Sequence, residues 1–298
     1  VTFSGNSPDF FGKIIVLNGT LNIENSNPIG TGAVEISKYG TLTGTGMLHG
    51  SFVVTAGGVV KPGNSPGFMS VDGTFSMKSG STYKQDIAGA TQASLLSPKG
   101  APGYYSYMNI LGALTIDSGA TLLPQIQNLF SSSESGYGSA PYVPKLGDQF
   151  RMLTAAGSIT GRFTTLTQPD GMAAGTQFVS FYNMNNSNSI DLAVIPSSYP
   201  TTISSASGNK NAQSVGAALD KIAQANVTGS STTAQDSLLY AISGQNSAGG
   251  IASYAQSLAG EVYAATVAVI AQTTQRVQQA VLTRLGDTMG IALPSAMT

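Results

Sequence analysis

The sequence of 298 residues contains no cysteine and no tryptophan, and it has a single histidine, His49. Without cysteine, neither a disulfide framework nor a thiolate metal site can form. A single imidazole excludes every site that needs two histidines, and a Ser-His-Asp triad would have to use His49. We expect His49, which lies in a glycine-rich stretch, to be a solvent-facing strand or turn residue. The residue types therefore predict no bound cofactor, no metal site and no catalytic residues.

Charged side chains are also scarce, at 9% of residues with a net charge of −1, against roughly 25% in ordinary soluble domains. There is no basic surplus for nucleic acid and no acidic surplus for cations. The polar surface must come from Ser, Thr, Asn and Gln, and glycine is abundant, with 36 residues. This composition favours a β-rich extracellular protein. No secretory signal follows Val1, so we expect a processed or partial chain.

Residues 63–67 match the G-x-S-x-G pattern of serine hydrolases, with Ser65 at the nucleophile position. That motif needs a strand before the serine and a helix after it. Here residues 68–77 alternate with period two and predict a strand instead. A near-copy of the motif occurs at residues 5–8. We therefore interpret the segment as a structural turn made of Pro62, Gly63, Asn64, Ser65, Pro66 and Gly67.

The first third of the chain repeats. Residues 19–23 (GTLNI) recur as residues 40–44 (GTLTG), and Gly58 and Gly73 begin similar segments at intervals of 18 and 15 residues. Short alternating strands with an imperfect period near 20 are typical of a solenoid. We predict a mainly β chain, a right-handed parallel β-helix whose coils occupy residues 1–72.

The repeat fades after residue 72, although strand-like runs continue at 83–87, 107–111, 114–116, 150–154, 178–182 and 190–194. Loop-like insertions interrupt these strands near 88–104 and 131–145. We predict that residues 73–196 form a β cap, because an uncapped final coil would leave a row of unpaired backbone groups. Residues 197–257 are predicted to be a Ser/Thr-rich linker followed by short helices at 211–224 and 235–243.

A long helix is predicted to begin near Leu258 and to run to about Leu285, within a segment of residues 258–298. Its apolar stripe consists of Val262, Val269, Ile270, Val277, Val281 and Leu285. The other face carries uncharged polar residues such as Gln272 and Gln279, and it is interrupted only by Glu261, Arg276 and Arg284. An ordinary surface helix would carry more charge on that face. Its most apolar part, residues 264–271, is far shorter than the roughly 20 residues that span a bilayer.

The order of these parts resembles the C-terminal passenger region of a bacterial autotransporter, the classical type V secretion family. The resemblance is carried by residues 19–46, which include 40–46, by the turn at 61–67 with 71–73, and by residues 150–154 with 161–163. It is completed by residues 211–220, 258–263 and 284–285 before the barrel. Each motif is degenerate alone, and together they cover nearly the whole chain.

The resemblance implies a passenger displayed at the surface of a Gram-negative bacterium or secreted after cleavage, with residues 73–196 acting as an autochaperone-like cap. The helix, including Arg284, would lie in the pore of a C-terminal β-barrel translocator. That barrel in the outer membrane would be the main partner, although it is not part of this sequence. The implied function is a structural stalk and an export and folding module without enzymatic activity.

Two alternatives remain open. An adhesin or biofilm-matrix protein would bind a host or matrix ligand, or a second copy, through the β-helix face. A β-helix polysaccharide-degrading enzyme would need clustered carboxylates on one face, whereas Asp86, Asp117 and Asp191 are isolated in the sequence.

Overall fold

The computed structural model describes residues 1–24, 30–98, 100–129 and 140–289, and within them the strands form three sheets. The first sheet contains β1 (Thr2–Phe3), β3 (Gly19–Ile23), β5 (Gly40–Gly44), β8 (Val59–Pro62), β11 (Thr82–Ile87), β12 (Thr91–Gln92), β13 (Tyr104–Tyr105), β16 (Thr121–Ile126) and β19 (Thr165–Leu166). The second contains β2 (Ile14–Val16), β4 (Val34–Ile36), β7 (Phe52–Val54), β10 (Phe75–Met77), β15 (Leu114–Ile116) and β18 (Ile159–Gly161). The third contains β6 (Met47–His49), β9 (Phe68–Asp72), β14 (Tyr107–Ile110), β17 (Gln149–Ala155), β20 (Thr176–Tyr182) and β21 (Ser189–Pro196).

The 21-residue repeat corresponds to a parallel strand pair. Gly19 lies opposite Gly40 and Leu21 opposite Leu42 in the pairing of β3 with β5, so identical residues stack on one another. The expected continuation at residue 73 is wrong, because β10 belongs to the second sheet, where Phe75 pairs with Phe52. Glycines lie close to strand starts in all three sheets. A glycine such as Gly73 therefore does not indicate which sheet the strand after it joins.

Most inward side chains of the three sheets meet in one apolar core. Leu42, Phe52 and Met69 represent the three sheets in it, and all are at most 1% exposed. Phe52 and Phe75 stack with their ring centroids 4.7 Å apart. This core continues from strands before residue 72 to strands after it, and β10, β11 and β14–β16 pair in parallel with their predecessors.

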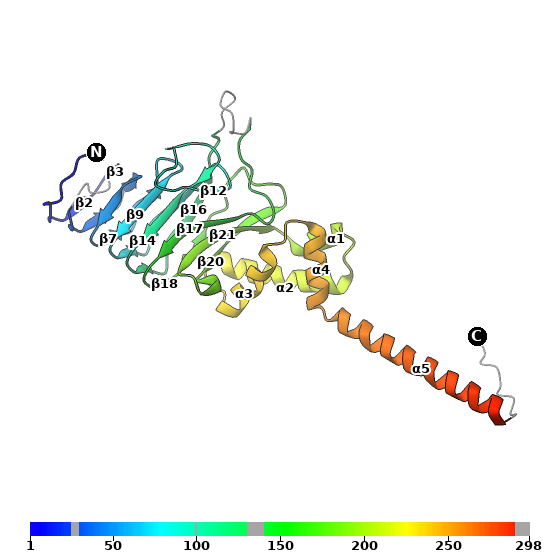
Figure 1. Ribbon diagram of the computed structural model, residues 1–298. Helices are drawn as coiled ribbons and strands as arrows, with labels where there is room; N and C mark the ends of the chain where they lie inside the picture. The colour runs from blue at the N-terminus through cyan, green and yellow to red at the C-terminus, as the bar shows by residue number, and fades with distance from the viewer. Residues whose placement is uncertain (25–29, 99, 130–139, 290–298) are drawn as a thin grey trace.

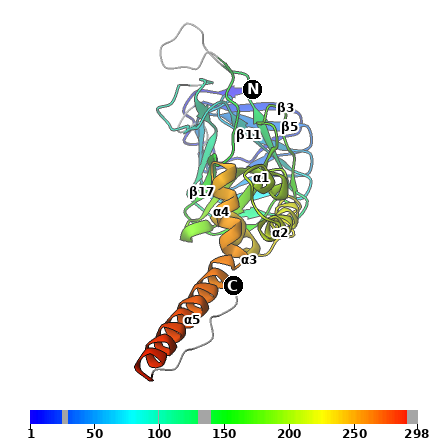
Figure 2. The same ribbon diagram turned by 90° about the vertical axis from the view of Figure 1, so that its right-hand side faces the viewer.

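Antiparallel pairing closes the third sheet. β21 runs antiparallel to β17 and to β20. The five helices of the described residues follow, and four of them pack on the outer side of β20 and β21 (Figures 1 and 2). They are α1 (Tyr199–Ser205), α2 (Lys210–Val227), α3 (Thr233–Ser243) and α4 (Ala248–Leu258), preceded by a short 3₁₀ helix at Met184–Asn186. Their second core includes Val179, Phe181 and Ile195 from the strands.

The predicted fold class is therefore corrected. The chain is not mainly β, since parallel sheets are combined with helices, at 25% helix and 34% strand, and the fold looks α/β. The strands form three separate sheets and not the coiled right-handed parallel β-helix that the period suggested. The helices are part of the folded body, because their apolar faces bury the outer side of the last two strands.

The helical third also differs in its boundaries. The expected linker contains α1, where Tyr199 and Ile203 are fully buried. The helix expected from near Leu258 to about Leu285 is confirmed as α5, which spans Glu261–Met289, although it begins three residues later because α4 ends at Leu258. Gly260, with φ of +74°, separates them, and a left-handed glycine is a common helix terminator. α5 extends away from the body, so that the N-terminus and the end of α5 lie at opposite ends of the molecule (Figure 1).

Candidate functional site

The turn with the hydrolase-like pattern lies between β8 and β9. Pro62 is the last residue of β8, and residues 63–67 connect it to β9, which begins at Phe68. A strand follows Ser65, so the helix required by the nucleophile elbow is absent at this position. Ser65 has a φ of +62°, and its hydroxyl points toward β11.

Ser65 belongs to a polar cluster around Asp86, whose side chain is fully buried. The Ser65 hydroxyl donates to Asp86 Oδ2 at 2.8 Å, and the Gln127 amide donates to Oδ1 at 2.6 Å. Lys61 Nζ lies 3.3 Å from the same carboxylate. Burial and the negative charge of Asp86 raise the pKa of the neighbouring Tyr83 hydroxyl far above its usual range. The carboxylate is thus supplied with donors from three segments, and the cluster ties the turn to β11.

A hydrolase triad is not assembled here. His49 lies in β6, and its Nδ1 is 3.0 Å from Asp72 Oδ2, while Ser65 is bonded to Asp86. The aspartates singled out from the sequence are each paired with a cation: Asp86 with Lys61, Asp117 with Lys78 at 3.4 Å, and Asp191 with Arg151 at 3.0 Å. Over the described ranges, no group of three or more His, Asp or Glu side chains could hold a metal ion.

Arg162 anchors the helices to the sheets. Its guanidinium bonds Asp236 Oδ2 at 2.6 Å and the Ser231 hydroxyl at 2.7 Å, and it lies over the ring of Tyr182. Asp236, which is fully buried at the start of α3, also accepts a bond from Asn226 of α2 at 2.8 Å. Asn226 in turn bonds both the N–H and the C=O of Ser180 in β20. Arg162, the centre of this Arg162 network, lies in residues 161–163, which contribute to the autotransporter resemblance.

The predicted pore residues lie on α5. All side chains from residue 270 to residue 284 are exposed, including the predicted Gln272, Gln279 and Arg284. The apolar stripe is exposed as well: Ile270 is 60%, Val277 58% and Val281 51% accessible. The side chains of Val262, Val269 and Leu285 are outside the described part. The described stripe residues Ile270, Val277 and Val281 therefore do not pack on α2 and α3.

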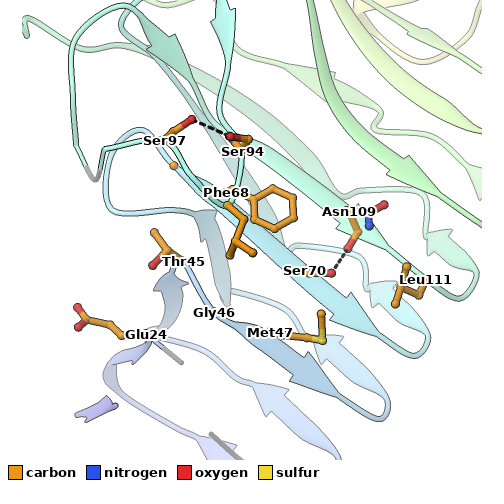
Figure 3. A pocket seen from close by; sticks show the side chains of 12 residues that line it. Glu24, Thr45, Gly46, Met47, Phe68, Ser70, Ser94, Ser97, Asn109 and Leu111 are labelled. Carbon is orange, nitrogen blue, oxygen red and sulfur yellow. Dashed lines mark hydrogen bonds between the residues drawn. The ribbon is translucent and has the colours of Figure 1, made fainter. Parts of the chain in front are cut away.

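A groove of about 550 Å³ lies on the outer face of the third sheet. Its floor is formed by side chains of β6, β9 and β14, and its wall by the loop between β12 and β13 (Figure 3). The lining residues are Glu24, Thr45, Gly46, Met47, Gly67, Phe68, Ser70, Ser94, Leu95, Ser97, Asn109 and Leu111. The loop is pinned at both ends, since Ala93 N donates to Tyr105 O at 2.9 Å and Gly100 N donates to Pro66 O at 3.1 Å.

The polar groups of the groove are largely engaged with one another. Ser70 Oγ donates to the backbone oxygen of Asn109 at 3.2 Å, and Ser94 and Ser97 share a hydrogen bond between their hydroxyls (Figure 3). The Asn109 Oδ1 atom accepts from Thr154. What remains accessible is mostly apolar, from Met47, Phe68 and Leu111. The groove is therefore suited to an apolar group.

Sequence reasoning identified the insertion near 88–104 but not the groove, because the floor residues come from three strands far apart in the chain. One local signal was present. The sequence Ser94-Leu95-Leu96-Ser97 places two leucines where a turn would carry glycine, asparagine or proline.

Comparison with known proteins does not assign the chain to a family. No protein-family profile matches it, and no curated protein matches it significantly. Within the described part of the chain, no helix is both long and apolar enough to cross a lipid bilayer.

Proposed function

We propose that the chain is a structural and folding module of an exported autotransporter passenger, displayed at the cell surface or released after cleavage. The sheets act as a stalk. The antiparallel strands and the helices on them close its C-terminal end. α5 leads into the barrel of the same precursor.

The observation that carries this proposal is α5. A helix of 29 residues, about 43 Å long at 1.5 Å per residue, exposes the described part of both its apolar stripe and its polar face, residues 270–284. An apolar stripe left in water is unfavourable, which favours a location where the helix is enclosed. The uncharged Gln and Thr face suits a polar and confined lumen.

The closed end supports the folding role. β20 and β21 are covered on one side by the first core and on the other by the helices. The sheet therefore does not end in a hydrophobic face open to water. Such an end can form first and act as a template for the upstream strands as they arrive.

The test is a fusion of the full chain, through Thr298, to an autotransporter barrel, expressed in a Gram-negative host with a signal peptide. Single cysteines replace Gln272 and Gln279 in α5, and a control cysteine replaces Ser237, an exposed residue of α3. We expect protease on intact cells to reach the sheets. The α5 cysteines should crosslink to lumen-facing barrel cysteines and resist a bulky external thiol reagent, which should label Ser237→Cys.

A fusion lacking residues 261–289 should fail to reach the surface. Equal labelling of all three cysteines without crosslinks would eliminate the pore location. Normal display without α5 would remove the export role.

A further inference from the structure

A second pocket, smaller than the groove, lies where the helices stop covering the third sheet. Its volume is about 310 Å³, and it is lined by Gln92, Tyr105, Gln149, Arg151, Asp191 and Tyr240. These residues come from strands of the first and third sheets and from α3. Ligand pockets often form at such junctions between packed units, and this volume is at the lower end of their usual range.

Strand pairing brings four of these side chains to one face. Gln149 and Arg151 are two residues apart in β17, so both point to the same side of the strand. Arg151 lies opposite Asp191 of β21, and paired residues share a face of a sheet. Asp191 is also paired with Phe181 of β20, whose ring packs edge-on with Tyr240 of α3 at a centroid distance of 5.1 Å. The pocket therefore lies at the margin where α3 covers β20 and β21 and leaves β17 exposed.

Contacts within the chain hold the rest of the lining in place. Gln92 and Tyr105 are paired in β12 and β13, and Gln92 Nε2 donates to the backbone oxygen of Arg151 at 3.0 Å. The Tyr240 hydroxyl accepts a bond from Asn185 at 3.2 Å. Burial raises the pKa of the Tyr105 hydroxyl above its usual value, so this group stays protonated at neutral pH. A ligand would therefore order few additional side chains on binding.

An ion pair makes the pocket polar without giving it a net charge. Arg151 Nε donates to Asp191 Oδ1 at 3.0 Å, and Nη2 donates to Oδ2 at 3.5 Å. The Asp191 side chain is 9% exposed, whereas that of Arg151 is 46% exposed. Within the described residues, the Nη1 donors of Arg151 have no partner. An entering anion would meet the Asp191 carboxylate and an entering cation would meet the guanidinium, so neither charge is favoured.

The two glutamines supply open acceptors. Gln92 Nε2 is bonded to the Arg151 backbone, and Gln149 Nε2 donates to Ser243 Oγ at 3.2 Å. These bonds orient the amides, and their Oε1 atoms have no partner in the described part of the chain. A purely apolar ligand would cover these oxygens without pairing them, which is unfavourable. The pocket thus combines carbonyl acceptors, guanidinium donors and tyrosine rings around a neutral centre.

We propose that this pocket binds one neutral pyranose unit of a glycan and does not cleave it. A sugar hydroxyl is both a donor and an acceptor, so it can donate to a glutamine oxygen and accept from Arg151 Nη1. The C–H groups of the sugar ring can lie against the half-buried ring of Tyr240. Glycoside hydrolysis commonly uses two carboxylates, and Asp191 is the single carboxylate among the six lining residues. This ligand site is a role beyond the stalk and export functions.

The test is a saturation-transfer difference NMR titration of the purified full chain with glucose, galactose, mannose and N-acetylglucosamine. We expect at least one of them to bind with a Kd in about the millimolar range, as suits a ligand of about a dozen heavy atoms. The double variant Gln92→Ala/Gln149→Ala removes both open acceptors and should weaken this binding at least about fivefold. Gln177→Ala is the matched control, because its Nε2 also donates to a backbone oxygen, that of Pro196 at 3.1 Å, outside the pocket. It should leave binding unchanged.

A second variant guards against a loss of folding, which urea denaturation checks for each protein. Arg151→Lys keeps a positive charge opposite Asp191 but lacks the planar fork that carries the Nη1 donors, and it should also weaken sugar binding several-fold. The proposal is overturned if none of the four sugars binds, or if both variants bind as the wild type does. Tighter binding of inorganic phosphate or glucuronate than of the neutral sugars would make the pocket an anion site and would overturn it as well. These measurements need neither barrel nor cells, so their outcome is separate from that of the export test.

Discussion

Among single residues, Gly63 is the position in the turn at 62–67 that is least able to carry a side chain. Its φ is +82°, and a Cβ there would lie 2.3 Å from the backbone of Gly67. Gly63→Val should destabilise the fold by about 3 kcal/mol or more, through backbone strain and overlap together. Urea denaturation measures this loss of unfolding free energy. Gly249→Ala in α4, where a Cβ meets nothing within 4 Å, should be neutral or slightly stabilising. Equal urea midpoints for Gly63→Val and Gly249→Ala would contradict the expected backbone strain at Gly63.

Ser65 is expected to act through its hydrogen bond to Asp86. Ser65→Ala removes one donor from a fully buried carboxylate, which should cost about 1–3 kcal/mol of unfolding free energy. A fluorophosphonate probe should not label the wild-type chain at this serine. Selective labelling of Ser65, with labelling lost in Ser65→Ala, would restore the nucleophile interpretation.

Tyr182 should make the fold sensitive to alkali. Burial, with a smaller contribution from Asp236, raises its pKa from the usual 10 to about 12. Between these values the unfolded chain loses a proton that the folded chain keeps, so stability falls as pH rises. The contribution is complete below pH 10 and amounts to about 2–3 kcal/mol, which is lost by about pH 12. Urea unfolding at several pH values should show this decline, and Tyr182→Phe should make it shallower. An unchanged slope would refute the assignment.

At the scale of elements, the Arg162 network decides whether α2 and α3 stay docked. Arg162→Met leaves the fully buried Asp236 without its cation, and an unpaired buried charge costs about 3–5 kcal/mol. Hydrogen exchange should accelerate first in α2 and α3. Lys78→Met breaks the half-exposed Lys78–Asp117 pair and should cost no more than about 1 kcal/mol. If both substitutions have the same effect, the network does not hold the helices.

Elements whose pattern is local were predictable from the sequence. The alternating runs at 83–87, 150–154 and 178–182 correspond to β11, β17 and β20. Alternating burial produces alternating apolar and polar residues over a few neighbouring positions, so such strands can be recognised locally. α1 was missed, since its serines and threonines are typical of a linker while Tyr199 and Ile203 provide its burial. The division of the strands among three sheets was also missed, as it depends on long-range pairing.

The candidate site shows the same limit. The turn at 62–67 was recognisable from glycine and proline alone, but the carboxylate that it contacts, Asp86, lies 21 residues later in a different strand. The groove has its floor on strands separated by tens of residues. Only the Leu95-Leu96 turn carried a signal within a few positions, because it breaks a local rule.

For the whole molecule, the helices should divide into an essential and a dispensable part. A chain ending at Ser198 uncovers the outer side of β20 and β21, where Val179, Phe181, Ala193 and Ile195 are at most 1% exposed. It should aggregate or bind a hydrophobic dye. A chain ending at Gly260 keeps α1–α4 and should unfold at the wild-type urea midpoint, because the described side chains of α5 are exposed. A well-behaved shorter chain would show that the second core is not needed.

The opposite placement of the two ends gives the molecule a definite mechanical behaviour. Neighbouring strands follow one another from the N-terminal end to the helices (Figure 1), so tension between the ends acts along the inter-strand hydrogen bonds. Such bonds break one row at a time, as in a zipper, and not all together. A force applied at the N-terminus would peel away β1 (Thr2–Phe3) and β2 (Ile14–Val16) first, while the strands nearest the helices stay paired. The chain would therefore lengthen in small steps under load. Its helical end would stay folded, and the released strands would pair with it again, one after another, when the load is removed.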